Sequence, residues 1–192
     1  MLMDKPIIIK DVLDRDLFLN VYKELHEHSN WKLINNSYQN DSERSWGVYP
    51  SHDNLTFYKA SITIKLKILK YIKKHIKLCK IHCNGQTRGQ VSRFHNDFDD
   101  DDVWTFVLFT QNNWNTQWGG EFVSQHLKTK EYFYTPYIPN TGALIPSNWE
   151  HYGQSPNMNT CELRTTIAFC YTVPKIYEKY IGWNDKTVMG YV

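Results

Sequence analysis

Two histidines and one aspartate are the side chains best suited to chemistry in this chain. His95 and Asp97 lie two positions apart, and His151 follows His95 by 56 positions (151 − 95). On a β-strand, side chains at positions i and i+2 point to the same face, so His95 and Asp97 can bind one metal ion together. A distant His151 would complete a face of two imidazoles and one carboxylate, which suits ferrous iron and leaves half of its coordination sphere open.

An arginine lies in an apolar segment after these residues. Arg164 follows His151 by 13 positions (164 − 151), and Thr166 lies two residues further on. An arginine in an apolar strand needs a buried anion, and its planar guanidinium group binds a carboxylate through two parallel hydrogen bonds. Thr166 would face the same side and donate its hydroxyl group to that carboxylate. A surface ion pair is the alternative interpretation of Arg164.

Two further motifs lie between the first histidine and the arginine. Residues 118–122 read Trp-Gly-Gly-Glu-Phe, and residues 142–147, just before His151, read Gly-Ala-Leu-Ile-Pro-Ser. The ordered set of H-x-D, these two motifs, a distal His and an Arg resembles the 2-oxoglutarate/Fe(II)-dependent oxygenase superfamily, and within it the prolyl 4-hydroxylase-like branch. The resemblance covers roughly residues 80–173.

The resemblance implies a mainly β fold, a double-stranded β-helix or jelly roll, with N-terminal helices packed on one sheet. It implies one oxygenase domain over residues 1–192, with helical support in 1–79, the β-helix core in 80–173 and a C-terminal segment in 174–192. Eight short segments separated by turn residues agree with such a sandwich or barrel.

The resemblance also implies a reaction. It assigns metal binding and catalysis to His95, Asp97 and His151, and co-substrate binding to Arg164 and Thr166. The implied cofactors are Fe(II), 2-oxoglutarate and O₂, with ascorbate as an optional addition. The implied reaction hydroxylates an unactivated C–H bond, with a peptidyl prolyl side chain as the first candidate, and releases succinate and CO₂.

Two positions depart from the family pattern. Many prolyl hydroxylases carry a tyrosine about ten residues before the first ligand histidine, where this chain has Gly85 beside Cys83 and Asn84. Phe109 stands where a tyrosine is common on the next core strand. We therefore expect the polar contacts of the co-substrate to differ from those of the family.

Hydrophobic periodicity and turn residues predict the order of the elements. Residues 6–10 are expected to form a strand, and Asp14 is expected to cap a helix that ends near residue 28. A second helix with a lysine-rich, solvated face is expected over 58–77, and a polar loop, either a lid or a plain surface loop, over 35–57. The strands expected after it are 80–84, 90–97, 103–110, 119–126, 131–138, 142–146, 149–154 and 163–173.

Composition excludes several classes of protein. The chain has 192 residues, of which 41% are hydrophobic and 15% aromatic, so a packed core is expected and disorder is not. A net charge of +2 argues against a nucleic-acid partner. The four cysteines lack the spacing of a zinc site, and the sequence has no run of about 18 apolar residues. Residues 1–10 are too short and too interrupted an apolar segment for us to expect a signal peptide. We expect free thiols in a cytoplasmic protein without a membrane segment.

Several alternatives remain open. The same chemistry could act on a free amino acid, another small molecule or a nucleic acid, and a non-catalytic metal-binding jelly-roll module is the contrasting class. Asp99 competes with Asp97 as the carboxylate ligand, although its position on a strand is about 7 Å further along. The segment 175–192, with Tyr177, Tyr180 and Trp183, would either pack on the body or contact a peptide, protein or small-molecule substrate. The oligomeric state stays open.

Overall fold

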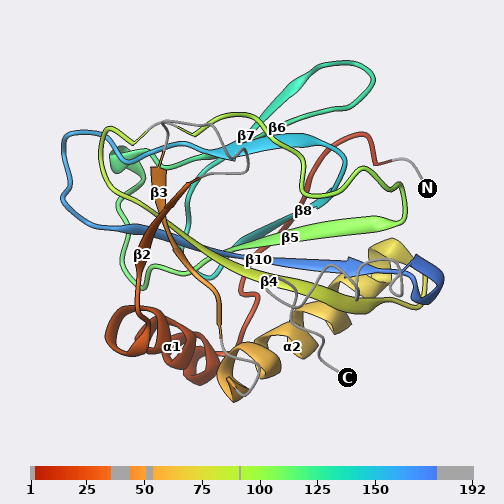
Figure 1. The fold of residues 1–192 in the computed structure, drawn as a ribbon, viewed down its shortest axis with the longest axis horizontal. Coiled ribbons are helices and arrows are strands. Elements are labelled where there is room, and N and C mark those ends of the chain that lie inside the picture. Colours follow the sequence, from red (N-terminus) through yellow and green to blue (C-terminus); the bar gives the residue numbers. More distant parts are fainter. Residues whose placement is uncertain (1–2, 36–43, 51–53, 91, 177–192) are drawn as a thin grey trace.

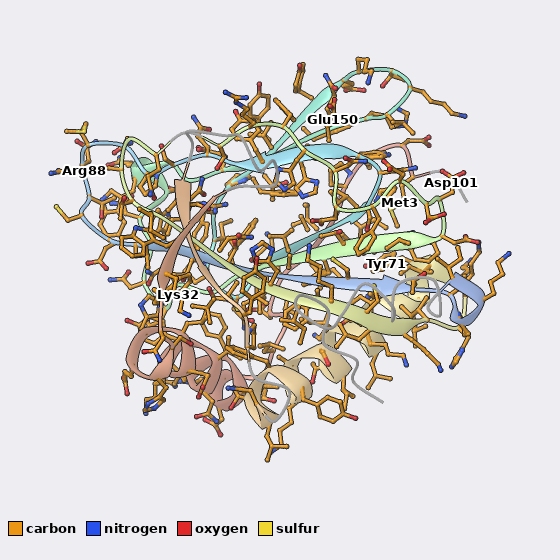
Figure 2. All side chains as sticks on the ribbon, viewed as in Figure 1. Met3, Lys32, Tyr71, Arg88, Asp101 and Glu150 are labelled. Carbon is orange, nitrogen blue, oxygen red and sulfur yellow. The ribbon has the colours of Figure 1, made fainter. Side chains whose placement is uncertain are left out.

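Two β-sheets face each other in the computed structural model, which describes residues 3–35, 44–50, 54–90 and 92–176. Two helices, α1 (Arg15–Lys23) and α2 (Leu55–Ile72), cover the outer face of the larger sheet (Figure 1). Side chains from both sheets enter the space between them (Figure 2). The architecture is the predicted one, a jelly roll with helices on one sheet.

The larger sheet has the strand order β1-β8-β5-β10-β4-β3-β2, and the smaller sheet has the order β7-β6-β9. All neighbouring strands run antiparallel. The strands are β1 (Ile7–Ile9), β2 (Lys32–Asn35), β3 (Arg44–Val48), β4 (Lys77–Gln86), β5 (Val103–Phe109), β6 (Phe122–Gln125), β7 (Tyr132–Thr135), β8 (Gly142–Pro146), β9 (Glu150–Gly153) and β10 (Arg164–Thr172).

The central strands β4 and β10 present alternate side chains to two different surroundings, as the strand period of two requires. Ile81, Ile167 and Phe169 lie in the hydrophobic core shared with the helices. Tyr171 is tied to α2, because its hydroxyl group donates a hydrogen bond to the carbonyl oxygen of Ser61 at 2.7 Å. The intervening positions line a cavity between the sheets: Lys80, His82, Asn84 and Gln86 on β4, and Arg164, Thr166 and Ala168 on β10.

Both helices begin at side chains that cap them. Asp14 accepts a hydrogen bond from the backbone N–H of Leu17 at 2.8 Å, as predicted, and a π-helical turn, η1 (Glu24–His28), continues α1 to the predicted end. Asn54 caps α2 in the same way through the N–H of Phe57 at 3.1 Å. A short 3₁₀ helix, η2 (Thr116–Trp118), precedes β6.

Four expectations about the elements need correction. The loop expected over 35–57 contains β3. The second helix spans Leu55–Ile72 rather than 58–77, and it ends at Ile72 because Lys73 adopts a left-handed conformation. Region 1–79, where one strand was expected over 6–10 besides the helices, also supplies β2 and β3 to the larger sheet. The strand expected over 90–97 is absent from its described part, where His95 forms an isolated bridge.

Part of the predicted loop, residues 36–43 and 51–53, and the segment from Tyr177 to Val192 lie outside the described residues. The predictions made for Tyr177, Tyr180 and Trp183 fall on that segment. Within the described ranges, no helix combines the length and apolar character that a bilayer crossing requires.

Candidate metal centre

Main-chain pairing brings the two histidines of the predicted metal site together. The backbone N–H of His95 donates to the carbonyl oxygen of His151 at 3.1 Å, and the N–H of His151 donates back at 2.8 Å. The two imidazole rings lie with centroids 4.6 Å apart. Two residues that exchange both backbone hydrogen bonds in an antiparallel bridge present their side chains on the same side. This bridge, rather than the expected strand, therefore brings the two imidazole rings together.

Asp97 joins the histidines through a different contact. Its backbone N–H donates to the carbonyl oxygen of Ser147, at the end of β8, at 3.0 Å. The potential ligand atoms of His95, Asp97 and His151 all lie within 4.8 Å of one another, a spacing that can surround one metal ion. Asp99, the competing carboxylate, is exposed and accepts a hydrogen bond from Asn96 at 2.6 Å instead.

Each histidine ring is oriented by the backbone carbonyl group two residues before it. The Nδ1 atom of His95 lies 3.1 Å from the carbonyl oxygen of Arg93, and the Nδ1 atom of His151 lies 3.0 Å from that of Trp149. A carbonyl oxygen accepts only, so Nδ1 carries the proton in each ring and Nε2 keeps its lone pair. Such an outer hydrogen bond fixes the tautomer and the ring direction that a metal ligand needs.

The carboxylate of Asp97 is held by a hydroxyl pair. Thr105 on β5 donates to Asp97 Oδ2 at 2.6 Å, and the hydroxyl groups of Thr105 and Ser147 lie 2.8 Å apart. His151 Nε2 lies 3.6 Å from the same Oδ2 atom. Burial acts to raise the pKa of Asp97, but the neighbouring His151, Lys80 and His95 and the Thr105 hydrogen bond outweigh it and hold this pKa below its usual range.

We expect Thr105→Val to weaken metal binding by roughly 10–100-fold, because partners of metal ligands typically contribute that much. The replacement keeps the shape of the side chain and removes only the hydroxyl group. Titration of the metal-free protein with Fe(II) or Co(II) measures the effect. The matched control is Thr110→Val, since the Thr110 hydroxyl group bonds Thr165 at 2.9 Å, away from the triad. Equal affinity in wild type and Thr105→Val would contradict the assigned role.

Burial keeps two histidines of the cavity neutral at neutral pH. It lowers the pKa of His151 to about 4, chiefly by desolvation, which the attraction of Asp97 offsets in part. Desolvation likewise lowers the pKa of His82 to about 3. A neutral imidazole is the form that binds a metal.

These shifts predict acid sensitivity of the metal-free protein. In the unfolded chain, histidines become protonated as the pH falls below their ordinary pKa of 6.5. In the folded protein, His151 becomes protonated only near pH 4, because its pKa is lowered to about 4. The free energy of unfolding therefore falls as the pH drops from about 6.5 to 4, on the order of 3 kcal/mol per histidine. Urea denaturation at pH 7 and pH 4.5 checks this, and equal midpoints at the two values would contradict it.

Arg164 lines the same cavity as the triad, and two hydrogen bonds hold its guanidinium group. Its Nε atom donates to the carbonyl oxygen of Gly120 at 2.7 Å, and Nη1 donates to Gln86 Oε1 at 2.9 Å. The guanidinium carbon lies 5.2 Å from the ring centre of Tyr137. Burial lowers the pKa of Arg164 to about 10, so the group stays cationic at neutral pH.

The Nη2 atom of Arg164 is buried and has no hydrogen-bond partner among the described residues. An unpartnered N–H on a buried cation is costly, and a carboxylate in the cavity would satisfy it. Thr166 lies two residues further along β10 and lines the same cavity, whose volume is about 350 Å³. The arrangement fits the carboxylate site expected from the sequence.

The double glycine of the Trp-Gly-Gly-Glu motif has a structural cause. Gly120 has φ of 85°, and a Cβ atom there would lie 3.1 Å from Arg164 Cδ. The residue can therefore bring its carbonyl oxygen to Arg164 only without a side chain. Trp114 closes the turn by donating its indole N–H to the carbonyl oxygen of Gly119 at 3.0 Å.

The departures from the family pattern also have structural causes. Gly85 lies on the face of β4 away from the cavity, where a Cβ atom would come within 2.9 Å of Trp31. Gln86 is the residue that reaches the arginine, and its amide nitrogen donates to Ser92 at 2.6 Å and to the carbonyl oxygen of Gly153 at 2.8 Å. Phe109 stacks on Tyr137 with centroids 4.9 Å apart instead of entering the cavity.

Sequence comparison finds no known protein family and no curated protein that matches this chain. Structural comparison finds many matches. A prolyl-4-hydroxylase from Pseudomonas putida has 13% identity and a TM-score of 0.66, with 88% of this chain and 92% of that one covered. A prolyl hydroxylase from Trichoplax adhaerens, in complex with a hypoxia-inducible-factor peptide fragment, has 14% identity and a TM-score of 0.68, with 94% and 87% covered.

HygX from Streptomyces hygroscopicus, with nickel and 2-oxoglutarate bound, matches at 12% identity and a TM-score of 0.66, with 88% and 83% covered. At such identities the likeness shows the fold. The fold is that of the 2-oxoglutarate/Fe(II) oxygenases, prolyl hydroxylases among them, as the resemblance in the sequence predicts.

Proposed function

We propose that this protein is an Fe(II)- and 2-oxoglutarate-dependent dioxygenase that hydroxylates an unactivated C–H bond and releases succinate and CO₂. The observation that carries the proposal is the convergence of His95, Asp97 and His151, with ligand atoms within 4.8 Å of one another, in a cavity shared with Arg164. Two imidazoles and a carboxylate are the donor set that ferrous iron accepts with positions left for other ligands.

His95, Asp97 and His151 would hold the iron, and Arg164 would bind the remote carboxylate of 2-oxoglutarate. The buried, unpartnered Nη2 atom of Arg164 supports this assignment, and Thr166 would add a hydroxyl donor. When bound, iron would activate O₂, the oxidant of the reaction, which takes two electrons from the decarboxylation of 2-oxoglutarate and two from the substrate C–H bond. The protein's part is to orient the acid between the guanidinium group and the triad, and to exclude water around both.

A peptidyl prolyl side chain is the first candidate substrate. The resemblance to prolyl 4-hydroxylases and the likeness in fold to an enzyme solved with a peptide fragment support it. Phe94 lines the cavity, and it packs against Tyr132 and Tyr152 at centroid distances of 5.6 and 4.7 Å. Flat aromatic rings suit an apolar ring such as that of proline.

The four cysteines support a cytoplasmic location. Cys79, Cys83 and Cys170 are buried free thiols, and Cys161 is an exposed free thiol. Free thiols persist in reducing compartments. The whole of residues 1–192 acts as one catalytic domain in this proposal.

The test is direct. Purified protein is incubated with Fe(II), 2-oxoglutarate, ascorbate, O₂ and proline-containing peptides, and succinate is quantified together with peptide mass. The expected result is a gain of about 16 Da, one oxygen atom, in step with succinate. Failure to consume 2-oxoglutarate under any of these conditions, by a protein that binds iron, would contradict the proposal.

A further inference from the structure

Lys80 is a further cation in the cavity, in addition to Arg164 and the exposed Arg93, and it lies beside the triad. Its Nζ atom lies 4.0 Å from Asp97 Oδ1, beyond hydrogen-bond distance, and 5.8 Å from the ring centre of Phe98. The side chain is 22% exposed and lines the cavity. An ammonium group can donate three hydrogen bonds. Neither of these two contacts with described residues is a hydrogen bond.

The strand register separates Lys80 from Arg164. Arg164 pairs with Gln86 and Cys170 pairs with Lys80, so the cations stand at opposite ends of the polar row on β4. Six residues of strand span about 20 Å. His82 lies between them on the same row, and its buried Nε2 atom also lacks a hydrogen-bond partner among the described residues.

Charge balance leaves Lys80 without a counterion once the proposed ligands are bound. Among the described residues that line the cavity, Asp97 is the one carboxylate, and iron would take up its charge. The charges of 2-oxoglutarate would be matched by Arg164 and by the metal. With those charges matched, the positive charge of Lys80 would be left uncompensated beside the metal, which is unfavourable in a secluded site.

We propose that Lys80 binds the carboxylate group of the substrate, so that the reacting molecule is a free amino acid rather than an internal peptide residue. The inference rests on the proposed iron and 2-oxoglutarate chemistry, and it favours a free amino acid over the peptidyl proline that was the first candidate substrate. The carboxylate would supply the negative charge that the loaded site lacks. It would also fix the reacting carbon near the triad, because the Lys80 ammonium group lies beside Asp97.

The experiment measures binding without turnover. Protein loaded with Ni(II) and saturated with 2-oxoglutarate is titrated calorimetrically with each standard L-amino acid and with its carboxamide, and with a short peptide that carries an internal proline. The acid and the amide differ in charge and hardly in size. We expect at least one amino acid to bind tenfold or more tightly than its amide and than the peptide.

Three variants assign this preference to one side chain. Lys80→Met removes the charge at similar length and is expected to abolish the preference, whereas Lys80→Arg is expected to keep most of it. Lys77→Met, at the exposed start of the same strand, is the matched control and is expected to behave as wild type. The affinities of Lys80→Met for Ni(II) and for 2-oxoglutarate are expected not to fall below those of wild type, since Lys80 makes no hydrogen bond to Asp97 and its positive charge repels the metal.

The outcomes separate the two proposals. Failure of the Ni(II)-loaded wild type to bind 2-oxoglutarate would defeat the proposed function itself. Normal binding of 2-oxoglutarate, with equal affinity for acids and amides or with no amino acid bound, would overturn only the role of Lys80. A preference that survives in Lys80→Met, or a loss in that variant confined to 2-oxoglutarate or Ni(II) affinity, would also overturn it.

Discussion

Alanine at His95, Asp97 or His151 is expected to reduce 2-oxoglutarate-dependent succinate release by more than ~100-fold, since even the partners of metal ligands typically account for 10–100-fold. The loss should come with loss of tight Fe(II) binding, because each residue supplies one of three ligand atoms that lie within 4.8 Å of one another. Circular dichroism should show an intact fold, since the triad lies at the cavity and not in the hydrophobic core.

Asp99→Ala is the matched control for the aspartate. Asp99 lies two residues from Asp97 and carries the same group, but it is exposed and bonded to Asn96. We expect this variant to keep wild-type iron affinity and turnover. Full turnover by Asp97→Ala, or loss of turnover in Asp99→Ala alone, would show that the wrong carboxylate has been assigned.

Arg164→Ala is expected to raise the KM for 2-oxoglutarate by ~100-fold or more while the KM for the substrate changes little. The reason is that the variant loses the buried, charge-assisted hydrogen bonds between the guanidinium group and the remote carboxylate of 2-oxoglutarate. Steady-state kinetics with each substrate varied in turn separates the two effects. The Kd of 2-oxoglutarate for the Ni(II)-loaded protein gives the same information without turnover.

Two more variants make the arginine result specific. Arg164→Lys retains the charge but not the planar fork, so an intermediate KM is expected. Arg88→Ala is the control, because Arg88 is exposed at one end of the molecule (Figure 2) and lies in the turn after β4. An unchanged KM for 2-oxoglutarate in folded Arg164→Ala would show that the guanidinium group does not anchor the acid.

The parts of the fold that the sequence predicted well are those with strong local patterns. The segment 163–173 has an unbroken apolar run at 167–171 and contains β10, and Asp14 precedes an apolar stripe at helical spacing and caps α1. In both cases the signal lies within a few residues of the element that it predicts.

The geometry around His95 could not be predicted in the same way. The i, i+2 argument required a strand over 90–97, whereas an isolated bridge to His151 and a hydrogen bond from Asp97 to Ser147 hold the residues in place. These contacts join positions some 50 residues apart in the sequence, and no local pattern reports them. The three residues do lie together, but contacts other than the expected strand bring them there.

The supporting residues were missed for two different reasons. Gln86 and Lys80 belong to a row of polar residues at every second position of β4, and that alternation within an otherwise apolar strand was a readable sign of a cavity wall. Thr105 stands alone in the apolar segment 103–109, where a threonine is as typical of strand packing as of a hydrogen bond to a ligand. Only the fold shows that its hydroxyl group meets Asp97.

Visible absorption under anaerobic conditions tests the central claim most directly, because it needs neither a known substrate nor turnover. Protein given Fe(II) and 2-oxoglutarate without oxygen is expected to develop a weak charge-transfer band, which requires metal and keto acid in one site. The band should be absent from Asp97→Ala, shift to much higher 2-oxoglutarate concentration in Arg164→Ala, and persist in Asp99→Ala. A wild-type sample that binds iron and stays colourless at saturating 2-oxoglutarate would contradict the account.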